Sequence, residues 1–472
     1  MGYKDLKAIS EYNPCKDLAR EIYQGLLKSY RNPLHYMLQY YQSIENDYQL
    51  INLSETGRTH NTMDNKVKPA ESELNNNEKI IIIGNGAAGI SAAKAIRKRN
   101  QEIKVTILDQ ENQVIYYKPL LSEYIAQDEV LKKIYLHKHK WYEDQGIDLK
   151  LGVSVTKINV EDQTIETAQG ETMAYDKLIL ALGSRSFIPP IKNADYEGVF
   201  TLRNIGDADK IKDYAKNCKK AVIIGGGLLG LEAADQLKAL GLDITVVELA
   251  NRLLPRQIDD KGAHIFEEGI LKQGIHLAKG NAVSMIIGHH KAEYVQLMDG
   301  RKIPADLVII SAGIVSEGYL AEEAGLEYDR SIIVNKHMQT SNPHIYAAGD
   351  VAQFSEKNYG IWPEAMEQGN VAGANAVGDK LTYKDFIPSN AFNGLNLNVF
   401  SIGQVNYDDD AHVAILGFED LENGIYKKLF FKNQGLVGAV IIGDNSKTKL
   451  VVEAMKKKSS PSELLEILTT NN

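Results

Sequence analysis

The first regular pattern of apolar residues along the chain is that of a strand, a tight turn, a helix and a second strand. Four consecutive isoleucines, Ile80–Ile83, predict a strand that is buried on both faces. Residues 84–89 are glycine-rich and lead without a spacer into a helical pattern over Ile90–Lys98. The next strand, Ile103–Leu108, is followed directly by Asp109. This order of elements, ending in an acid, is the pattern of a dinucleotide-binding unit.

Each glycine of the turn has its own expected role. Gly84 permits the sharp turn, and Gly86 lets backbone N–H groups approach a pyrophosphate without a Cβ in the way. Gly89 lets the helix pack closely on the strand, and Asp109 is placed to accept hydrogen bonds from ribose hydroxyls.

The same pattern recurs in the middle of the chain. Ala221–Ile224 is a predicted strand, residues 225–230 form a second glycine turn, and Leu231–Leu240 is a predicted helix. Ile244–Val247 is the following strand, and it ends in Glu248. Two glycine turns with matched acids predict two separate nucleotide-binding domains.

Glu248 bears on the choice of coenzyme. A carboxylate at this strand end accepts hydrogen bonds from a ribose 2′-hydroxyl and repels a 2′-phosphate, so the second unit is expected to favour NADH over NADPH. Arg252, four residues later, is a cation that suits a phosphate, and it leaves the strictness of this preference open.

Three further apolar strands are followed by glycine, and the last of them delivers Gly349 and Asp350 to the carboxyl edge of its sheet, where open α/β sheets bind ligands. They are Lys177–Leu182 before Gly183, Leu307–Ile310 before Gly313, and the strand within residues 340–348 before Gly349 and Asp350. A helix follows at Trp362-Pro363-Glu364 and runs to about Gly378, with Pro363 suited to the first helical turn.

The fold class is therefore predicted as α/β, with two Rossmann-like dinucleotide-binding domains, a C-terminal α+β domain and an N-terminal helical extension. The N-terminal stretch is rich in tyrosine and then in polar residues, and it is equally compatible with a packed appendage and with a docking or oligomerisation element. Residues 1–77 are predicted as the helical extension and polar linker. The first dinucleotide domain is predicted in two segments, 78–190 and 306–385, with the second dinucleotide domain, 191–305, inserted between them and the C-terminal domain at 386–472.

Composition narrows the class of function. The net charge of −9 argues against a nucleic-acid surface, and the two cysteines, Cys15 and Cys218, are too few and too far apart for a thiolate metal site or an iron–sulfur cluster. The alternate His137 and His139 lack a third ligand nearby, so no metal site is predicted. No run of apolar residues is long enough for a membrane span, and a cytoplasmic location is expected.

From Lys79 to Leu468 the chain resembles the flavoprotein reductases with two dinucleotide-binding domains, and most closely the clostridial-type NADH:rubredoxin oxidoreductases. The shared motifs are the two glycine turns, Tyr117-Lys118-Pro119, Thr340 to Asp350, Trp362-Pro363-Glu364 and Gly443-Asp444. Residues 1–77 lie outside the resemblance.

The resemblance implies FAD and NADH as cofactors, and it implies which residues hold them. Gly84, Gly86, Gly89 and Asp109 would bind the adenosine half of FAD, Asp350 its ribityl chain, and Gly225, Gly227, Gly230 and Glu248 NADH. Gly183, Gly313 and Gly349, at the strand ends, are further candidates for cofactor contact.

The resemblance also implies three residues beside the flavin. Glu232 matches a family glutamate that lies near the flavin N5 and pairs with a cation, for which Lys118 is the candidate. Close relatives have a lysine at the position of Glu123, which puts this pairing in question. Trp362 would lie near the flavin, with the helix behind it directing N–H groups at the flavin N1 and C2 carbonyl. Each residue also has a purely structural interpretation: Lys118 as a surface lysine, Glu232 as part of an exposed helix face, and Trp362 as a core tryptophan.

The favoured function is electron transfer from NADH through FAD to a small electron-carrier protein such as rubredoxin or ferredoxin. Residues 116–124 contain no cysteine, which argues against the thiol-dependent relatives. A flavin-based NADH sensor or interaction module, and a peroxide-forming NADH oxidase, are the alternatives. Two basic stretches, Lys132–Lys140 and Lys447–Lys458, are candidate docking surfaces for an acidic carrier or ordinary solvated surfaces. The oligomeric state is left open.

Overall fold

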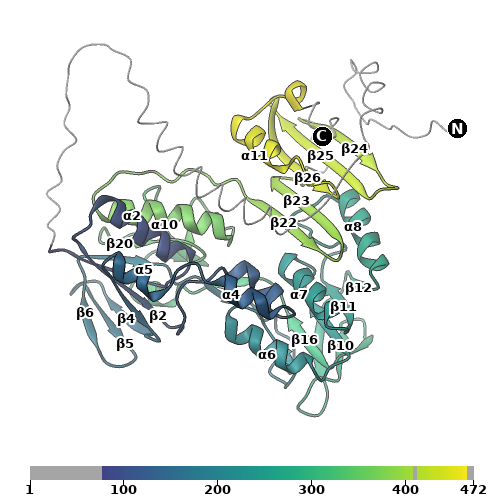
Figure 1. The fold of residues 1–472 in the computed structure, drawn as a ribbon, viewed down its shortest axis with the longest axis horizontal. Coiled ribbons are helices and arrows are strands. Elements are labelled where there is room, and N and C mark those ends of the chain that lie inside the picture. Colours follow the sequence, from purple (N-terminus) through teal and green to yellow (C-terminus); the bar gives the residue numbers. More distant parts are fainter. Residues whose placement is uncertain (1–76, 408–411, 465–472) are drawn as a thin grey trace.

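A computed structural model describes residues 77–407 and 412–464. The predicted N-terminal extension, except for its last residue, lies outside the described residues. The first dinucleotide unit lies at one end of the molecule, and the second unit and the C-terminal domain lie together at the other end (Figure 1). Within the described residues, no helix is both long and apolar enough to cross a membrane.

The first unit is built on a parallel five-stranded sheet in the order β20-β7-β1-β2-β3. Its strands are β1 (Lys79–Ile83), β2 (Lys104–Asp109), β3 (Ile147–Leu151), β7 (Lys177–Leu180) and β20 (Ile345–Ala347). Helices α2 (Ala87–Arg99) and α10 (Trp362–Ala376) lie side by side along the sheet (Figure 1). The four isoleucines of β1 are at most 5% exposed, as expected for a strand covered on both faces.

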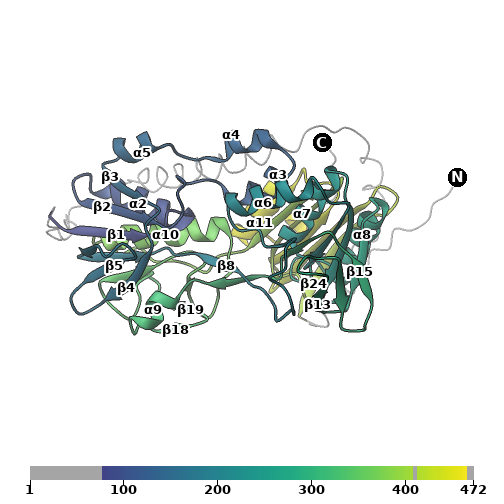
Figure 2. The ribbon, with the colours of Figure 1, turned by 90° about the horizontal axis from the view of Figure 1, so that it is seen from below.

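Smaller elements complete this unit. They are the sheet of β4 (Val155–Asn159), β5 (Thr164–Thr167) and β6 (Thr172–Ala174), the sheet of β18 (Tyr328–Asp329), β19 (Ser331–Ile333) and β21 (Ala352–Gln353), and helices α5 (His139–Asp144) and α9 (Tyr319–Glu323). Figure 2 shows β4, β5, α9, β18 and β19 on the side of the unit away from α5.

Helices α2 and α10 approach each other closely because glycine and alanine form their contact. A Cβ atom on Gly369 would lie 2.2 Å from the carbonyl oxygen of Ala88, and one on Gly373 would lie 2.2 Å from that of Ala92. Positions four apart on a helix share one face, so the two glycines form a single smooth strip against α2.

The second unit repeats this plan with a sheet in the order β12-β11-β10-β16-β9. Its elements are β9 (Val199–Phe200), α6 (Ile205–Ala215), β10 (Lys220–Ile224), α7 (Leu228–Ala239), β11 (Asp243–Glu248), α8 (Asp260–Lys272), β12 (His276–Lys279) and β16 (Leu307–Ile310), with a hairpin sheet of β13 (Val283–Ile287), β14 (Tyr294–Leu297) and β15 (Lys302–Pro304). Alternate residues of β10 lie on opposite faces of the sheet and pack into different cores. Ala221 and Ile223 join the core that contains helix residues such as Leu231, whereas Val222 and Ile224 pack with the hairpin sheet.

One predicted boundary is wrong. The strand Leu307–Ile310 was expected in the second segment of the first unit, which was predicted to begin at residue 306. It is β16 instead, and it pairs in parallel with β10 of the second unit from Ala221↔Leu307 to Ile224↔Ile310. The chain crosses back only afterwards, through β17 (Ile314–Ser316), which pairs antiparallel with β8 (Ser184–Ser186).

The C-terminal domain is an antiparallel sheet in the order β22-β23-β26-β25-β24 that packs with helix α11 (Thr448–Lys457). Its strands are β22 (Ser389–Gly394), β23 (Leu397–Gly403), β24 (Val413–Asp420), β25 (Ile425–Lys432) and β26 (Gly435–Ile442). One face packs under α11, with Phe400 and Phe431 in that core, and the other face joins the core of the second unit through Phe392 and Phe430. The first strand of this domain, β22, begins three residues after the predicted boundary at residue 386.

A buried carboxylate fixes the C-terminal domain to the second unit. Asp259 is 4% exposed and caps α8, where its side chain accepts from the Gly262 N–H. The Tyr426 hydroxyl and the Lys428 ammonium, both on β25, also donate to Asp259, at 2.8 and 2.6 Å. A buried charge is tolerated when it is paired and hydrogen-bonded in this way.

Short helices connect the two dinucleotide units. They are η3 (Lys118–Leu120), α3 (Leu121–Tyr124), η4 (Asp128–Val130) and α4 (Leu131–Ile134). Helix α3 contacts α7, and side-chain hydrogen bonds cross between the units here, among them Ser122 to Glu232 at 3.0 Å and Gln127 to Gln236 at 3.3 Å.

We expect Gly373→Ala to lower the free energy of unfolding by about 1–3 kcal/mol, because the added methyl group overpacks the contact between α2 and α10. Urea titration of circular dichroism measures this change. Gly206→Ala in α6 is the control, since the nearest atom to its new Cβ is the end of the Asn204 side chain at 3.3 Å. Equal stability of the two variants would contradict the close helix contact.

Candidate functional site

A cavity of about 1190 Å³ opens along the carboxyl edge of the first sheet. The predicted site residues that line it are Gly84, Gly86, Asp109, Lys118, Gly183, Gly349, Asp350 and Trp362. Leu229, from the first turn of α7, lines the same cavity. The cavity therefore draws its walls from both dinucleotide units.

The two glycine turns have the same contacts. A Cβ on Gly84 would lie 2.1 Å from the carbonyl oxygen of Ala181, and one on Gly225 would lie 2.1 Å from that of Ser311. Both glycines also have a positive φ, at 109° and 116°. No other residue fits either position, because the backbone of the neighbouring strand end occupies the place of a side chain.

The last glycine of each turn touches the first. A Cβ on Gly89 would lie 1.9 Å from the carbonyl oxygen of Gly84, and one on Gly230 would lie 2.2 Å from that of Gly225. These contacts confirm the close packing of helix on strand that the glycine spacing predicts.

The two acids close their turns in matching ways. Asp109 accepts from the backbone N–H of Asn85 at 2.6 Å and of Glu111 at 2.8 Å. Glu248 accepts from the backbone N–H of Gly226 at 2.7 Å and of Ala250 at 2.8 Å. Each carboxylate thus holds its glycine turn in shape, a role that sequence analysis did not assign. Burial raises the pKa of Asp109, and the two backbone hydrogen bonds oppose this change.

The first turn has room for an anion. An ideal Cβ on Gly86 would meet no atom within 4 Å, so the space beside this residue is open. Helix α2 begins at Ala87 with no acidic residue in its first turn and with glycine as its N-cap. Its first N–H groups are thus available to a phosphate, and the cavity fits a dinucleotide with its pyrophosphate at this helix start.

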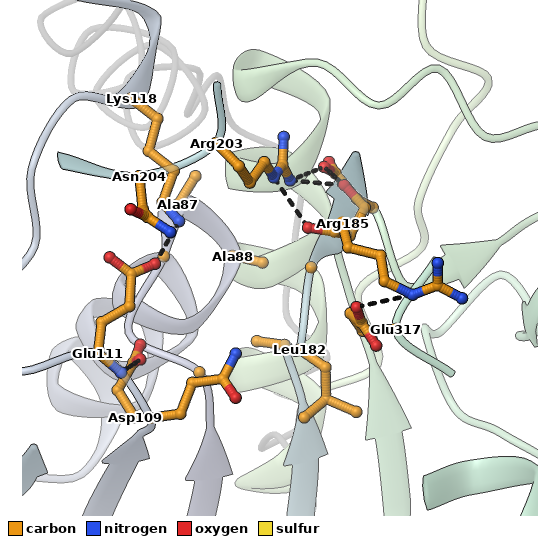
Figure 3. Close-up of a pocket in the computed structure, with 18 of the residues that line it drawn as sticks. Ala87, Ala88, Asp109, Glu111, Lys118, Leu182, Arg185, Arg203, Asn204 and Glu317 are labelled. Atoms are coloured by element: carbon orange, nitrogen blue, oxygen red, sulfur yellow. Dashed lines mark hydrogen bonds and ion pairs between the residues drawn. The ribbon is translucent and has the colours of Figure 1, made fainter. Parts of the chain in front are cut away.

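Asp350 is held by a cation that sequence analysis missed. The Arg203 guanidinium donates to Asp350 Oδ2 at 2.8 Å and to the backbone carbonyl of Ser184 at 2.8 Å. The Ser184 hydroxyl donates to the same Asp350 oxygen at 2.6 Å. Figure 3 shows Arg203 reaching across the cavity wall to these partners. Arg203 follows β9, so a residue at the start of the second unit fixes an acid of the first.

The predicted pair of Lys118 with Glu232 is not formed. The Lys118 ammonium lies 2.7 Å from Glu111 Oε1, as Figure 3 shows, and Tyr116 donates to the other oxygen of Glu111 at 2.6 Å. Glu232 instead accepts from the Ser122 hydroxyl. The reason is local: Glu111, in the loop after β2, offers Lys118 a partner within the first unit.

Trp362 lies at the start of α10 and lines the cavity. Its ring meets that of Tyr117 edge to face, with centroids 5.0 Å apart. Behind it, Glu364 is buried and accepts from the Tyr359 N–H at 3.0 Å and from the Tyr383 hydroxyl at 3.1 Å. Burial raises the pKa of Glu364 to about 7. The aromatic pair and the buried acid fix the direction of the helix start toward the cavity.

The remaining predicted residues lie outside the cavity wall. Gly225, Gly227, Gly230 and Glu248 form the second turn, where the space beside Gly227 is open, as it is beside Gly86. Gly89 packs inside the first turn, and Gly313 lies just beyond β16 with a positive φ of 113°.

Comparison with known proteins identifies the family of the chain. A family model described as pyridine nucleotide-disulphide oxidoreductase matches residues 78–369. A second model, the rubredoxin NAD⁺ reductase C-terminal domain, matches residues 388–459.

Among solved structures, the chain is similar to NADH:rubredoxin oxidoreductase from Clostridium acetobutylicum, with a TM-score of 0.67 and 29% identity over 81% of this chain and 96% of that one. It is also similar to a ferredoxin reductase from Rhodopseudomonas palustris, with a TM-score of 0.75 and 25% identity over 81% of this chain and 96% of that one.

Two curated relatives are informative. The chain is 36% identical to the nitrite reductase [NAD(P)H] of Bacillus subtilis, over 83% of this chain but only 48% of the relative, so it spans about half the length of that protein. It is 32% identical to the NADH-rubredoxin oxidoreductase of Clostridium acetobutylicum, over 83% of this chain and 98% of the relative. The chain belongs to the pyridine nucleotide-disulphide oxidoreductase family and has a C-terminal domain of the rubredoxin NAD⁺ reductase type.

Proposed function

We propose that this protein passes electrons from NADH, through FAD, to a small electron-carrier protein such as rubredoxin or ferredoxin. The observation that carries the proposal is the cavity shared by the two units, in which the first glycine turn, Asp350 and the start of α10 meet Leu229 of α7. A flavin bound in this cavity would be held close to the helix start of the coenzyme domain, and direct hydride transfer needs such proximity.

The residues of the cavity fit FAD. The start of α2 would receive the pyrophosphate, Asp109 the adenosine ribose and Asp350 the ribityl hydroxyls. When bound, FAD supplies the ability to take a hydride and release its electrons singly. The chain supplies position and electrostatics. The start of α10 places partial positive charge beside Trp362, where it would stabilise negative charge on a reduced flavin ring.

The described residues offer no thiol for a disulfide or persulfide reaction. No cysteine of the described residues lines the cavity, and Cys218 lies just beyond α6 in the second unit, where burial raises the pKa of its thiol. A raised pKa keeps a thiol protonated and unreactive. This supports an external electron carrier as the acceptor over thiol chemistry.

The surface that suits an acidic carrier is the lysine cluster of α11, made of Lys447, Lys449, Lys456, Lys457 and Lys458. Within the described part of the chain, no carboxylate forms an ion pair with any of these five lysines. Lys456 also acts electrostatically on Glu367 of α10, so the end of the cluster lies near the helix that starts at the cavity. The other basic stretch is partly neutralised, because Lys132 pairs with Glu129 and Lys140 with Asp144.

Glu232 is the proposed proton-holding group between the units. Burial raises its pKa to about 7; the Ser122 hydroxyl opposes this change, whereas the charges of Glu123 and Asp235 add to it. In place of the ion pair expected from the resemblance, the contact of α3 with α7 thus holds a carboxyl that takes up a proton near neutral pH.

A panel of acceptors tests the proposed function. After anaerobic reduction of the flavin with NADH, we expect rapid reoxidation by a rubredoxin or a ferredoxin and slow reoxidation by oxygen. Fast flavin reduction without turnover to any carrier would favour the sensor alternative. Rapid reoxidation by oxygen alone, with peroxide as product, would favour the oxidase.

The hydrogen bond from Arg203 to Asp350 predicts that the two residues contribute unequally to FAD binding. Asp350→Ala is expected to be purified largely without flavin. Arg203→Gln is expected to weaken FAD binding by roughly tenfold to a hundredfold, because a hydrogen bond from a charged group is lost. Fluorescence titration of the apo-protein with FAD measures both. Arg301→Gln, which removes an exposed arginine paired with Asp299, is the control. Full flavin occupancy in Asp350→Ala would contradict the assignment.

The raised pKa of Glu232 predicts a pH-dependent stability difference. The folded protein holds the proton more tightly than the unfolded chain, so wild-type stability falls as pH rises from about 4.5 to about 7. Glu232→Gln keeps a partner for Ser122 and removes this fall. Its melting temperature should exceed that of wild type at pH 8, and the difference should vanish or reverse near pH 4.5. For the exposed Glu161→Gln variant, the difference in melting temperature from wild type should not depend on pH. A difference independent of pH for Glu232→Gln would contradict the raised pKa of Glu232.

The docking role of α11 predicts a selective effect. Reversal of Lys456, Lys457 and Lys458 to glutamate should slow carrier reduction at low salt by on the order of tenfold and flatten its dependence on ionic strength. Flavin reduction by NADH and turnover with ferricyanide should be unchanged.

The matched control for α11 is reversal of Lys98, Lys104 and Lys302 to glutamate. These lysines are exposed, and their reversal makes the same change in net charge. If both triple variants slow the carrier equally, net charge and not a docking surface is responsible.

A further inference from the structure

Arg252 lies in the segment that returns to the second glycine turn. Two residues beyond it, the Leu254 N–H donates to the Gly226 carbonyl at 3.1 Å, and Gly226 in turn donates to Glu248. The arginine is therefore attached to the turn at which the coenzyme ribose is expected. A cation in this neighbourhood would ordinarily serve a 2′-phosphate.

The guanidinium is nevertheless held elsewhere. It forms an ion pair with Asp260, in the first turn of α8, and its Nη2 donates to Asn406 Oδ1 at 2.8 Å and to the Pro255 carbonyl at 3.2 Å. Asn406 also donates to the Pro255 carbonyl, at 3.0 Å. Asn406 follows β23, so the C-terminal domain supplies one of the groups that hold the arginine.

The hold is not an optimal site for an arginine. The Nε group of Arg252 is buried, and none of the described residues accepts a hydrogen bond from it. A buried donor without an acceptor costs free energy. The other nitrogens of Arg252 thus hold the side chain in place. A rotation toward a phosphate would give Nε an acceptor and remove the cost of the unpaired donor.

We propose that Arg252 determines coenzyme specificity by being held away from the ribose site: Asp260 and the C-terminal-domain residue Asn406 keep its guanidinium from a 2′-phosphate, and Glu248 alone faces the 2′ position. The inference rests on the binding of NADH at the second glycine turn. It makes the C-terminal domain contribute to coenzyme selection as well as to the surface for the acceptor.

The proposal predicts different effects of two changes at position 406. Asn406→Ala loosens the hold, and Asn406→Asp tightens it by adding a charge. Affinity for adenosine 2′,5′-bisphosphate, measured by calorimetry, should rise about fivefold to tenfold in Asn406→Ala and should not rise in Asn406→Asp. Affinity for 5′-AMP, which lacks the 2′-phosphate, should be the same in both variants. The ratio of flavin reduction rates with NADPH and NADH should follow the bisphosphate affinity.

Further variants separate coenzyme specificity from domain packing. In a Glu248→Ala background, Asn406→Ala should add to the gain in NADPH use, and Arg252→Gln should abolish that addition. Glu419→Gln breaks a different contact between the C-terminal domain and α8, the 2.5 Å pair with Lys261, and should leave the NADPH to NADH ratio unchanged.

Equal bisphosphate affinity in Asn406→Ala and Asn406→Asp, or a gain in Glu419→Gln as large as that in Asn406→Ala, would overturn the proposal. Failure of 5′-AMP to bind any variant would instead contradict the use of the second turn for the coenzyme.

Discussion

The architecture depends on main-chain contacts that a single Cβ atom would prevent. In each dinucleotide turn, the first glycine lies against the carbonyl at the end of the neighbouring strand, and the last glycine lies against the first. An acid at the end of the next strand then accepts from the backbone of the turn. Together these contacts leave the first N–H groups of α2 and α7 directed at open space beside Gly86 and Gly227. Because the turns are formed by backbone contacts, a bound phosphate would be held by backbone N–H groups.

The second constraint is the way in which the units are joined. Arg203, at the start of the second unit, holds Asp350 of the first, and Ser122 of α3 holds Glu232 of α7. The C-terminal domain is fixed to the second unit by Asp259 and Arg252. The chain thus consists of a first unit, to which we assign the flavin in the proposed function, and of a second unit and C-terminal domain that share a core. The shared cavity lies where these two bodies meet.

Much of this plan is readable from the sequence. The glycine spacing and the acids predicted both turns, because close backbone approach has a strict local signature. The pairing of Leu307–Ile310 was misassigned, because its pattern of an apolar strand ending in glycine is equally compatible with either sheet. The Lys118 and Glu232 pair was wrong, since Glu111 and Ser122 offer nearer partners that only the fold brings together. Arg203 had no motif to mark it, although an arginine at the entry to an inserted domain was a signal available in the sequence.

The central claim is that a coenzyme bound at the second turn meets a flavin in the shared cavity and transfers hydride directly. The most direct test is anaerobic flavin reduction with NADH carrying deuterium on one face of C4 or on the other. Direct transfer between fixed partners predicts a primary isotope effect for one of the two labelled coenzymes only. A primary effect with both labels, or with neither while flavin reduction is limited by chemistry, would contradict the account.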